Sequence, residues 1–198
     1  GGIAFDALDA PAILEQAAQQ ANLANFPLRN ADGRRGIGVA SYYERTGGGP
    51  TERAWVDISV TGHVSAVVGT QSSGQGHDTA WAQIIAEELG LDLNQIELRA
   101  ASTDLLAAGG GTGGSRSAVQ AGRSFLRATA DVIAKAQPKA ADMLEVAQAD
   151  LQFDKETSSF TVVGTDRSIT LMRVAAALDG LKGHGGTDDT VMTTPNGC

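Results

Sequence analysis

Cysteine is almost absent from this chain, since Cys198 is the single one in 198 residues. One cysteine excludes an internal disulfide framework and fits a reducing compartment, so we expect a cytoplasmic location, with the periplasm as the alternative. Charges interrupt every apolar run well before the roughly 18 residues that a spanning helix needs, and no basic and then apolar leader opens the chain. The sequence therefore predicts neither a membrane span nor a secretory signal.

Positive charge is also scarce, because 15 basic residues face 23 acidic ones and the net charge is -8. Such a field repels phosphate backbones, so we expect no nucleic-acid partner. An anionic ligand would have to be attracted by local backbone geometry. Glycine, by contrast, is abundant, with 25 residues grouped in clusters that have no fixed period.

Apolar residues at helical spacing predict several helices. The first covers about 10–22 and is capped by Asp9. The clearest amphipathic helix follows Gly76 and ends at Gly90. Further helices are expected at about 115–137, at 139–149 after Pro138, and at 168–178 with Ser168 as the cap.

Alternating apolar and smaller or polar residues predict strands in other segments. One such alternation runs from Ile37 to Tyr43, and 54–60 with 64–70 form a hairpin around Gly62. Strands are also expected at 96–100 and, as a pair around a turn, within 151–163. Beyond Gly180 the sequence shows no periodic pattern of apolar residues.

Strand runs followed by grouped helices are typical of an α+β fold. We expect a mostly antiparallel or mixed sheet with amphipathic helices packed on it. The expected organisation is a leading helix and linker at 1–33, an α+β core at 34–180 and an irregular tail at 181–198.

Two glycine-containing loops stand directly before predicted helices, at 71–77 and 109–115. A helix start has unpaired N–H groups and about half a positive charge, and glycine lets a bulky anion approach the backbone. Both loops are therefore candidates for phosphate or pyrophosphate binding, and simple chain reversal is the alternative. Arg116 is either a phosphate clamp or a solvated arginine, and His77 is expected to cap or orient its helix.

Other catalytic motifs fail on particular residues. Gly109, Gly111 and Gly114 match G-x-G-x-x-G without the βαβ context of a dinucleotide site. The same loop lacks the lysine of a P-loop, and Ser115 lacks the final glycine of a nucleophile elbow. The three histidines are too far apart in the sequence for metal-ligand spacing. These observations argue against a Rossmann domain, a hydrolase and a protein-ligated metal.

Taken in order, several segments resemble the molybdenum-cofactor-binding large subunit of the xanthine oxidase family, the molybdenum hydroxylases. This family includes the aldehyde oxidoreductases and carbon monoxide dehydrogenases. The segments are Gly33-Arg34-Arg35-Gly36-Ile37-Gly38-Val39-Ala40, Thr46-Gly47-Gly48-Gly49-Pro50, Gly74-Gln75-Gly76-His77-Asp78-Thr79, Ser102-Thr103-Asp104 and Gly111-Thr112-Gly113-Gly114-Ser115-Arg116-Ser117.

The resemblance implies a molybdopterin-binding domain, with the pterin cofactor held by both glycine loops. In bacteria this cofactor is usually molybdopterin cytosine dinucleotide. The implied cofactor-binding residues are Gly74, Gln75, Gly76, His77, Thr112, Gly114, Ser115 and Ser117. Ser41 and Tyr42 fall near family positions that face the substrate channel. The pterin's sulfurs hold the metal, so no protein ligand to it is expected.

The resemblance further implies oxidative hydroxylation of an aldehyde, an N-heterocycle or a related small molecule, with water as the oxygen source. Electrons leave through iron–sulfur clusters and often FAD, expected on other domains or subunits. The catalytic base is a glutamate expected outside this segment, so the isolated chain is predicted to be inactive. The chain is then an excised domain or part of a split subunit, with the rest of the molybdenum subunit as partner. The alternatives are a non-catalytic assembly module and a generic nucleotide-binding domain.

Overall fold

The computed structural model describes residues 9–26, 33–42, 46–47, 49, 51–100, 102–106, 108–188 and 192–193. The chain divides into two compact units, one formed by 1–46 with 192–198 and the other by 47–191. Two short strands, β1 (Thr46–Gly47) and β9 (Met192–Thr193), pair with each other. Among the described residues, no helix has the length and apolar character needed to cross a lipid bilayer.

The first unit contains the predicted leading helix, α1 (Ala10–Gln20), followed by the short η1 (Leu23–Asn25). The Asp9 side chain accepts a hydrogen bond from the Ala12 amide at 3.0 Å, as predicted for the cap. The strand predicted from Ile37 is wrong for the described residues 37–42, which have no regular structure, while Tyr43 lies outside the described part. A strand needs a hydrogen-bonded neighbour, and no described residue pairs with this segment.

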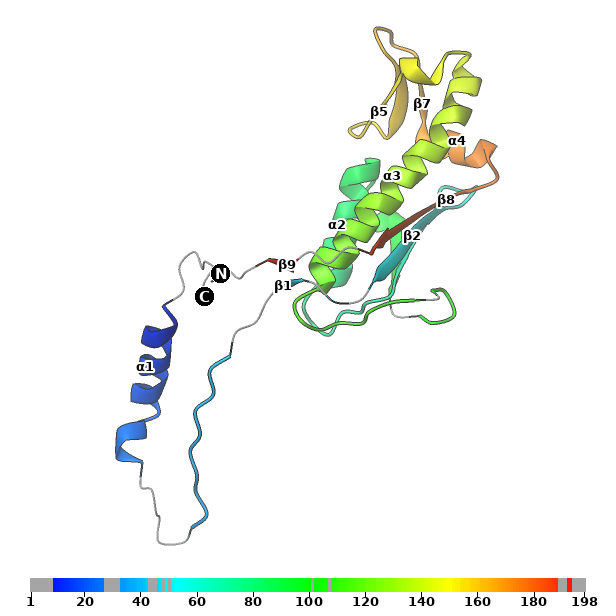
Figure 1. Cartoon of the computed structure of the whole chain (residues 1–198). Coiled ribbons are helices and arrows are strands. Elements are labelled where there is room, and N and C mark those ends of the chain that lie inside the picture. The colour runs from blue at the N-terminus through cyan, green and yellow to red at the C-terminus, as the bar shows by residue number, and fades with distance from the viewer. Residues whose placement is uncertain are drawn as a thin grey trace. The chain divides into compact units, whose positions relative to one another are not determined.

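The second unit is built on a four-stranded mixed sheet with the order β4-β3-β2-β8 (Figure 1). The predicted hairpin is confirmed as β2 (Glu52–Ile58) and β3 (Val64–Val68), which pair antiparallel. The predicted strand β4 (Ile96–Ala100) lies parallel to β3, because the chain crosses over through a helix between them.

Two helices pack on one face of this sheet (Figure 1). They are α2 (His77–Leu89), followed by the short η2 (Leu93–Gln95), and the long α3 (Ser117–Leu144). Along β2 the buried positions alternate with more accessible ones, as expected of a sheet with one covered face. The core consists of apolar side chains from this face and from both helices, including Val56, Ile58, Trp81, Ile85, Phe125 and Val132.

The irregular tail predicted for 181–198 is wrong at its start, because β8 (Leu181–Thr187) is a strand of the central sheet. Its glycines hide the alternation that would reveal a strand. They are required because α3 lies directly on β8: a Cβ on Gly183 would overlap the Ala128 carbonyl, and one on Gly185 the Ser124 carbonyl.

Helix α3 runs unbroken through Pro138, so the predicted division into two helices at this proline is wrong. Pro138 and Ala134 are both exposed, and water can therefore satisfy the carbonyl that the proline leaves without an N–H partner. The helix ends at Leu144 and is followed by the short η3 (Gln148–Asp150).

A second, antiparallel sheet contains β5 (Leu151–Asp154), β6 (Ser159–Val162) and β7 (Ser168–Thr170). The two strands predicted within 151–163 are thereby confirmed. The last helix, α4 (Leu171–Ala177), is capped by Thr170 instead of the predicted Ser168, because Ser168 pairs with Thr161 in the sheet. Mixed and antiparallel sheets with packed helices confirm the α+β class.

Candidate cofactor site

The two glycine loops meet at one edge of the central sheet. One follows β3 and leads into α2, and the other follows β4 and leads into α3. Since β3 and β4 are parallel neighbours, their carboxyl ends lie at the same edge. The antiparallel β2 begins at this edge, which brings its first residue, Glu52, next to both loops.

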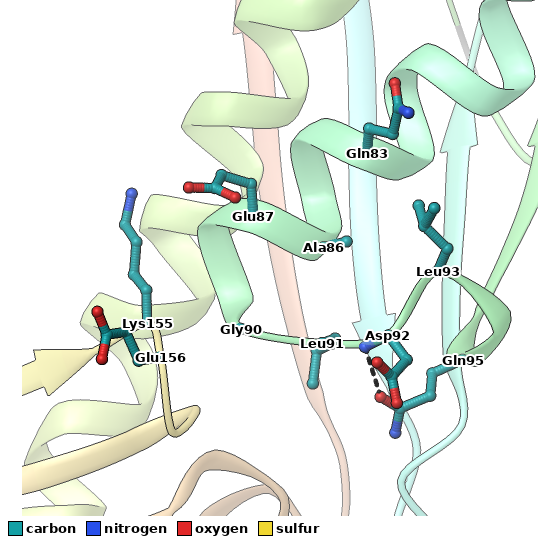
Figure 2. A pocket seen from close by; sticks show the side chains of 10 residues that line it. All are labelled: Gln83, Ala86, Glu87, Gly90, Leu91, Asp92, Leu93, Gln95, Lys155 and Glu156. Carbon is teal, nitrogen blue, oxygen red and sulfur yellow. Dashed lines mark hydrogen bonds between the residues drawn. The ribbon is translucent and has the colours of Figure 1, made fainter.

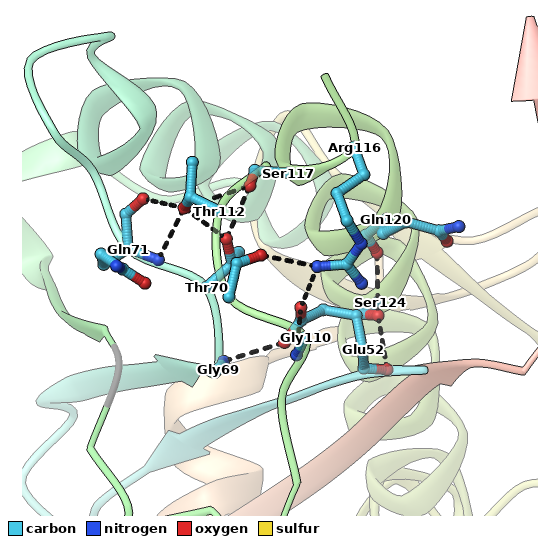
Figure 3. Close-up of polar contacts among 11 residues, drawn as sticks. Glu52, Gly69, Thr70, Gln71, Gly110, Thr112, Arg116, Ser117, Gln120 and Ser124 are labelled. Atoms are coloured by element: carbon cyan, nitrogen blue, oxygen red, sulfur yellow. Dashed lines mark hydrogen bonds and ion pairs between the residues drawn. The ribbon is translucent and has the colours of Figure 1, made fainter. Parts of the chain in front are cut away.

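Three hydroxyl groups join the loops (Figure 3). The buried Thr70 Oγ1 lies 2.8 Å from Thr112 Oγ1 and 2.6 Å from Ser117 Oγ. Thr112 Oγ1 also donates to the Gln71 carbonyl at 2.5 Å. The predicted Thr112 and Ser117 are thus brought together, through a threonine that the sequence analysis did not single out.

A buried ion pair lies beneath this hydroxyl cluster. Arg116 Nη1 is 3.1 Å from Glu52 Oε2, with side chains only 5% and 0% exposed. Arg116 also donates to the Gly111 carbonyl at 2.7 Å. Arg116 is therefore neither the solvated arginine nor the free phosphate clamp considered from sequence, because its guanidinium is committed inside the protein.

The loop backbones above the cluster are accessible. Gly74, Gly76, Gly111 and Gly114 have positive φ angles of 107°, 75°, 65° and 57°, and an added Cβ at any of them would meet nothing within 4 Å. Ser115 also has a positive φ, of 50°, which is uncommon for a residue with a side chain. A ligand can therefore approach the backbone at these positions.

Both helices that begin at the loops lack a side-chain cap. Gly76 precedes α2 and Arg116 precedes α3, and neither makes a side-chain capping hydrogen bond. Helix α2 carries Asp78 in its first turn, whereas the first turn of α3 has no acidic residue. Because a nearby carboxylate opposes a second negative charge, the start of α3 is the better acceptor for an anion.

Gln75 and His77 stand at the entry to α2. Gln75 is exposed, and its Oε1 accepts a hydrogen bond from the Ser73 amide at 2.5 Å. The His77 ring stacks on Trp81 with 4.7 Å between ring centroids, and His77 Nδ1 and Trp81 Nε1 are buried without a hydrogen-bond partner. His77 therefore packs against its own helix instead of capping it through its side chain.

Ser41 and Tyr42, the predicted substrate-channel residues, belong to the first unit and are exposed, Tyr42 by 86%. The cofactor-loop residues belong to the second unit. The role of Ser41 and Tyr42 stays a prediction.

Glu52 and Thr70 are the site residues that sequence analysis missed. The sequence does contain an indication for Glu52. It occupies the next position of the alternating series Ala54, Val56 and Ile58, whose side chains face the core, and it is the one charged residue of that series. A buried carboxylate must have partners, but only the tertiary structure identifies them. Thr70 carries no comparable local signal.

A pocket of about 570 Å³ lies at the C-terminal end of α2 (Figure 2), whereas the first glycine loop precedes the N-terminal end of that helix. It is lined by the last turns of α2, the segment 90–95 and the turn at Lys155 and Glu156. Its lysine is paired with Glu88 at 2.7 Å. Among the described residues, no group of three or more His, Cys, Asp or Glu side chains is arranged to hold a metal ion.

Comparison with known proteins identifies the family. The molybdopterin cofactor-binding domain family matches residues 12–195. The chain is 35% identical over 190 residues to the gamma subunit of the 6-hydroxypseudooxynicotine dehydrogenase complex of Paenarthrobacter nicotinovorans, covering 93% of this chain and 24% of that protein. It is 40% identical over 152 residues to the carbon monoxide dehydrogenase large chain of Afipia carboxidovorans, covering 71% and 18%.

A solved structure of Cu,Mo-CO dehydrogenase in its carbon monoxide reduced state superposes with a TM-score of 0.71 at 34% identity, over 92% of this chain and 25% of that one. The chain thus spans about a quarter or less of the length of these relatives. With a family match over nearly its whole length, the chain belongs to the molybdopterin cofactor-binding domain family and corresponds to a segment of a molybdenum hydroxylase large subunit.

Proposed function

We propose that the loops at 69–77 and 109–117 hold molybdopterin cytosine dinucleotide in a molybdenum hydroxylase. The complete enzyme then hydroxylates an aldehyde, an N-heterocycle or a related small molecule with water. When bound, the cofactor supplies the redox-active metal for this oxidation. The observation that carries the proposal is that two open, glycine-rich helix starts share one sheet edge.

The residues of the α3 loop fit the pyrophosphate of this cofactor. The backbone at Gly114 and Ser115 is open, and α3 offers an uncapped N-terminus without a competing carboxylate. Amide groups and the helix dipole can then attract the anion although the net charge is -8. Thr112 and Ser117 hold this loop against Thr70, which follows β3, through their hydroxyls.

The residues of the α2 loop fit the pterin. Gly74 and Gly76 leave the backbone open, and Gln75 between them presents an exposed amide that can both donate and accept hydrogen bonds. His77 follows this loop as the first residue of α2, and its ring stacks on Trp81. These features suit a flat, polar heterocycle more than a second phosphate, because Asp78 lies nearby.

The rest of the active site is proposed to lie outside this segment. The catalytic glutamate belongs to that remainder, whereas Ser41 and Tyr42 lie within this segment and are proposed to contribute to the substrate channel. The partners are the remaining part of the molybdenum subunit and the subunits or domains that carry iron–sulfur clusters and FAD. The cytoplasm is the proposed location.

A titration with cytidine 5′-diphosphate, which carries a cytidine and a pyrophosphate, tests the cofactor site. Calorimetry should detect binding to the wild-type chain and at least ~10-fold weaker binding to Gly113→Ala. The added methyl group enters the open space beside the α3 loop in which the ligand is proposed to lie. Gly36→Ala adds the same methyl group in open space within the first unit, at a position that belongs to neither loop, and serves as control. Equal affinity for Gly113→Ala and wild type would contradict the proposal, and equal affinity for adenosine 5′-diphosphate would favour a generic nucleotide site.

One observation favours an assembly module as the second candidate function. Helix α1 buries none of its residues, and Ile13 and Leu14 are 48% and 39% exposed. An amphipathic helix with its apolar face uncovered is suited to packing on another polypeptide. Light scattering of the chain alone and of the chain mixed with the remaining portions of the subunit tests this role. Association with those portions, together with failure to bind cytidine 5′-diphosphate, would support an assembly role without a cofactor site.

A further inference from the structure

The carboxylate of Glu52 contacts both glycine loops from below (Figure 3). We propose that Glu52 is a positioning residue that fixes the two loops relative to each other in the geometry that binds the cofactor. This inference rests on the proposed function and adds a residue that does not touch the cofactor.

Both carboxylate oxygens of Glu52 are engaged by backbone amides. Oε1 accepts from the Gly69 amide at 3.1 Å, and Oε2 accepts from the Gly110 amide at 3.2 Å. Oε2 also lies 3.1 Å from Arg116 Nη1, and the same Nη1 donates to the Gly111 carbonyl at 2.7 Å. One side chain at the start of β2 therefore links the loop after β3 with the loop before α3.

The loops touch each other at glycines that leave no room for adjustment. A Cβ on Gly69 would lie 2.5 Å from Gly109 Cα and 2.6 Å from Glu52 Oε1, and a Cβ on Gly110 would lie 2.5 Å from Arg116 Nη1. Because backbone packs on backbone here, a displacement of Glu52 must move at least one of the loops.

Glu52 cannot bind the cofactor directly. Its side chain is fully buried, and its negative charge is balanced by Arg116, so it neither reaches an anionic ligand nor repels one at close range. Glu52 supplies two hydrogen-bond acceptors, one carboxylate oxygen for the Gly69 amide and the other for the Gly110 amide. Glutamine has nearly the same shape but places an NH₂ group against one of these donors, which disrupts the link without leaving a cavity.

The test is calorimetry of the full chain with cytidine 5′-diphosphate for wild type and Glu52→Gln. We expect affinity to fall at least ~10-fold in the variant. Hydrogen exchange followed by NMR should show faster exchange at the Gly69 and Gly110 amides, while the amides paired between β2 and β3 keep their protection. Asp57→Asn removes a carboxylate from the same strand at a half-buried position, where it pairs with Lys182, and should bind as wild type does.

The variant Phe160→Ala distinguishes the positioning role of Glu52 from a general contribution to stability. It removes a buried ring from the second sheet and lowers the stability of the protein at a site away from the loops. It should keep wild-type affinity below its unfolding temperature. If Phe160→Ala weakens binding as much as Glu52→Gln, the loss reflects stability and the inference is rejected. If Glu52→Gln does not fold, Glu52→Asp keeps the charge but shortens the reach to the Gly69 and Gly110 amides, and undiminished affinity in that variant overturns the inference.

The two proposals fail in different ways. Equal binding by wild type and a folded Glu52→Gln rejects the positioning role and leaves the cofactor site intact. No binding by the wild-type chain rejects the proposed function and this inference with it.

Discussion

Thr70 illustrates how a single hydroxyl holds the candidate site together. Its Oγ1 is buried between Thr112 and Ser117, within 2.8 Å and 2.6 Å of their hydroxyl oxygens. A hydroxyl donates one hydrogen bond and accepts up to two, so three of them can satisfy one another in a small space. Thr187, in β8, is equally buried, but its Oγ1 has no hydrogen-bond partner.

These two threonines predict opposite responses to the same substitution. Thr70→Val should lower the free energy of unfolding by about 1–3 kcal/mol, because it leaves two polar groups without their common partner. Thr187→Val should be neutral or stabilising, since it removes an unsatisfied buried oxygen. Urea denaturation of both variants measures the difference, and equal losses would show that the Thr70 hydrogen bonds contribute nothing.

Individual glycines were only partly predictable from sequence. Gly74, Gly76, Gly111 and Gly114 stand in clusters before helices, and this pattern indicated loops open to a ligand. Gly183 and Gly185 carried no such signal, because the reason for them is α3, whose backbone packs where their side chains would be.

Helix α3 is the element that ties the second unit together, and Asp131 is one of its fixed contacts to β8. The Asp131 carboxylate accepts from Lys135 Nζ at 2.7 Å and from the His184 amide at 2.8 Å. Partial burial raises the pKa of this carboxyl, but the hydrogen bonds from Lys135 and His184 outweigh it and hold the pKa below the usual 3.8.

We expect the contribution of Asp131 to the free energy of unfolding to depend on pH. Because its pKa is lowered on folding, the contribution is complete above its usual pKa and is lost as the pH falls through the folded-state pKa. Asp131→Asn should therefore lower the free energy of unfolding at pH 7 by about 0.5–1.5 kcal/mol, and the difference from wild type should shrink by about pH 3. Denaturation curves at both pH values measure it.

Asp142→Asn is the matched control for that experiment, because Asp142 pairs with Lys139 on the exposed face of the same helix. It should have the smaller effect at neutral pH. A loss for Asp131→Asn that is the same at both pH values would contradict an electrostatic role for this contact.

The periodic elements were the most predictable. The β2–β3 hairpin and helix α2 were predicted with nearly their observed bounds, because their patterns of burial lie within a few neighbouring residues. Continuity of α3 through Pro138 was not predictable in this way, since it depends on which side of the helix faces solvent.

At the scale of the whole molecule, the charge distribution constrains how an anion can bind. The net charge is -8, and Arg116, the arginine of the α3 loop, is buried against Glu52. The long-range field therefore repels an anionic ligand, while amides at the helix start attract it at short range.

This balance predicts an unusual response to salt. Raising ionic strength from about 0.02 to about 0.3 M should increase the association rate of cytidine 5′-diphosphate, because screening weakens the long-range repulsion first. Stopped-flow measurements across this range, with potassium glutamate as the salt to limit competition by chloride, provide the test. A steep decrease with salt would instead indicate an exposed cationic site.

The amino-acid sequence by itself determined the α+β class, the main hairpin and helix, the two glycine loops and the family resemblance, because each depends on residues close together along the chain. Only the tertiary structure decided that 181–187 is a strand, that α3 passes through Pro138, and that Glu52 and Arg116 form a buried pair beneath the loops. These features depend on contacts between segments tens of residues apart, and no local pattern records which distant backbone a glycine or a buried carboxylate will meet.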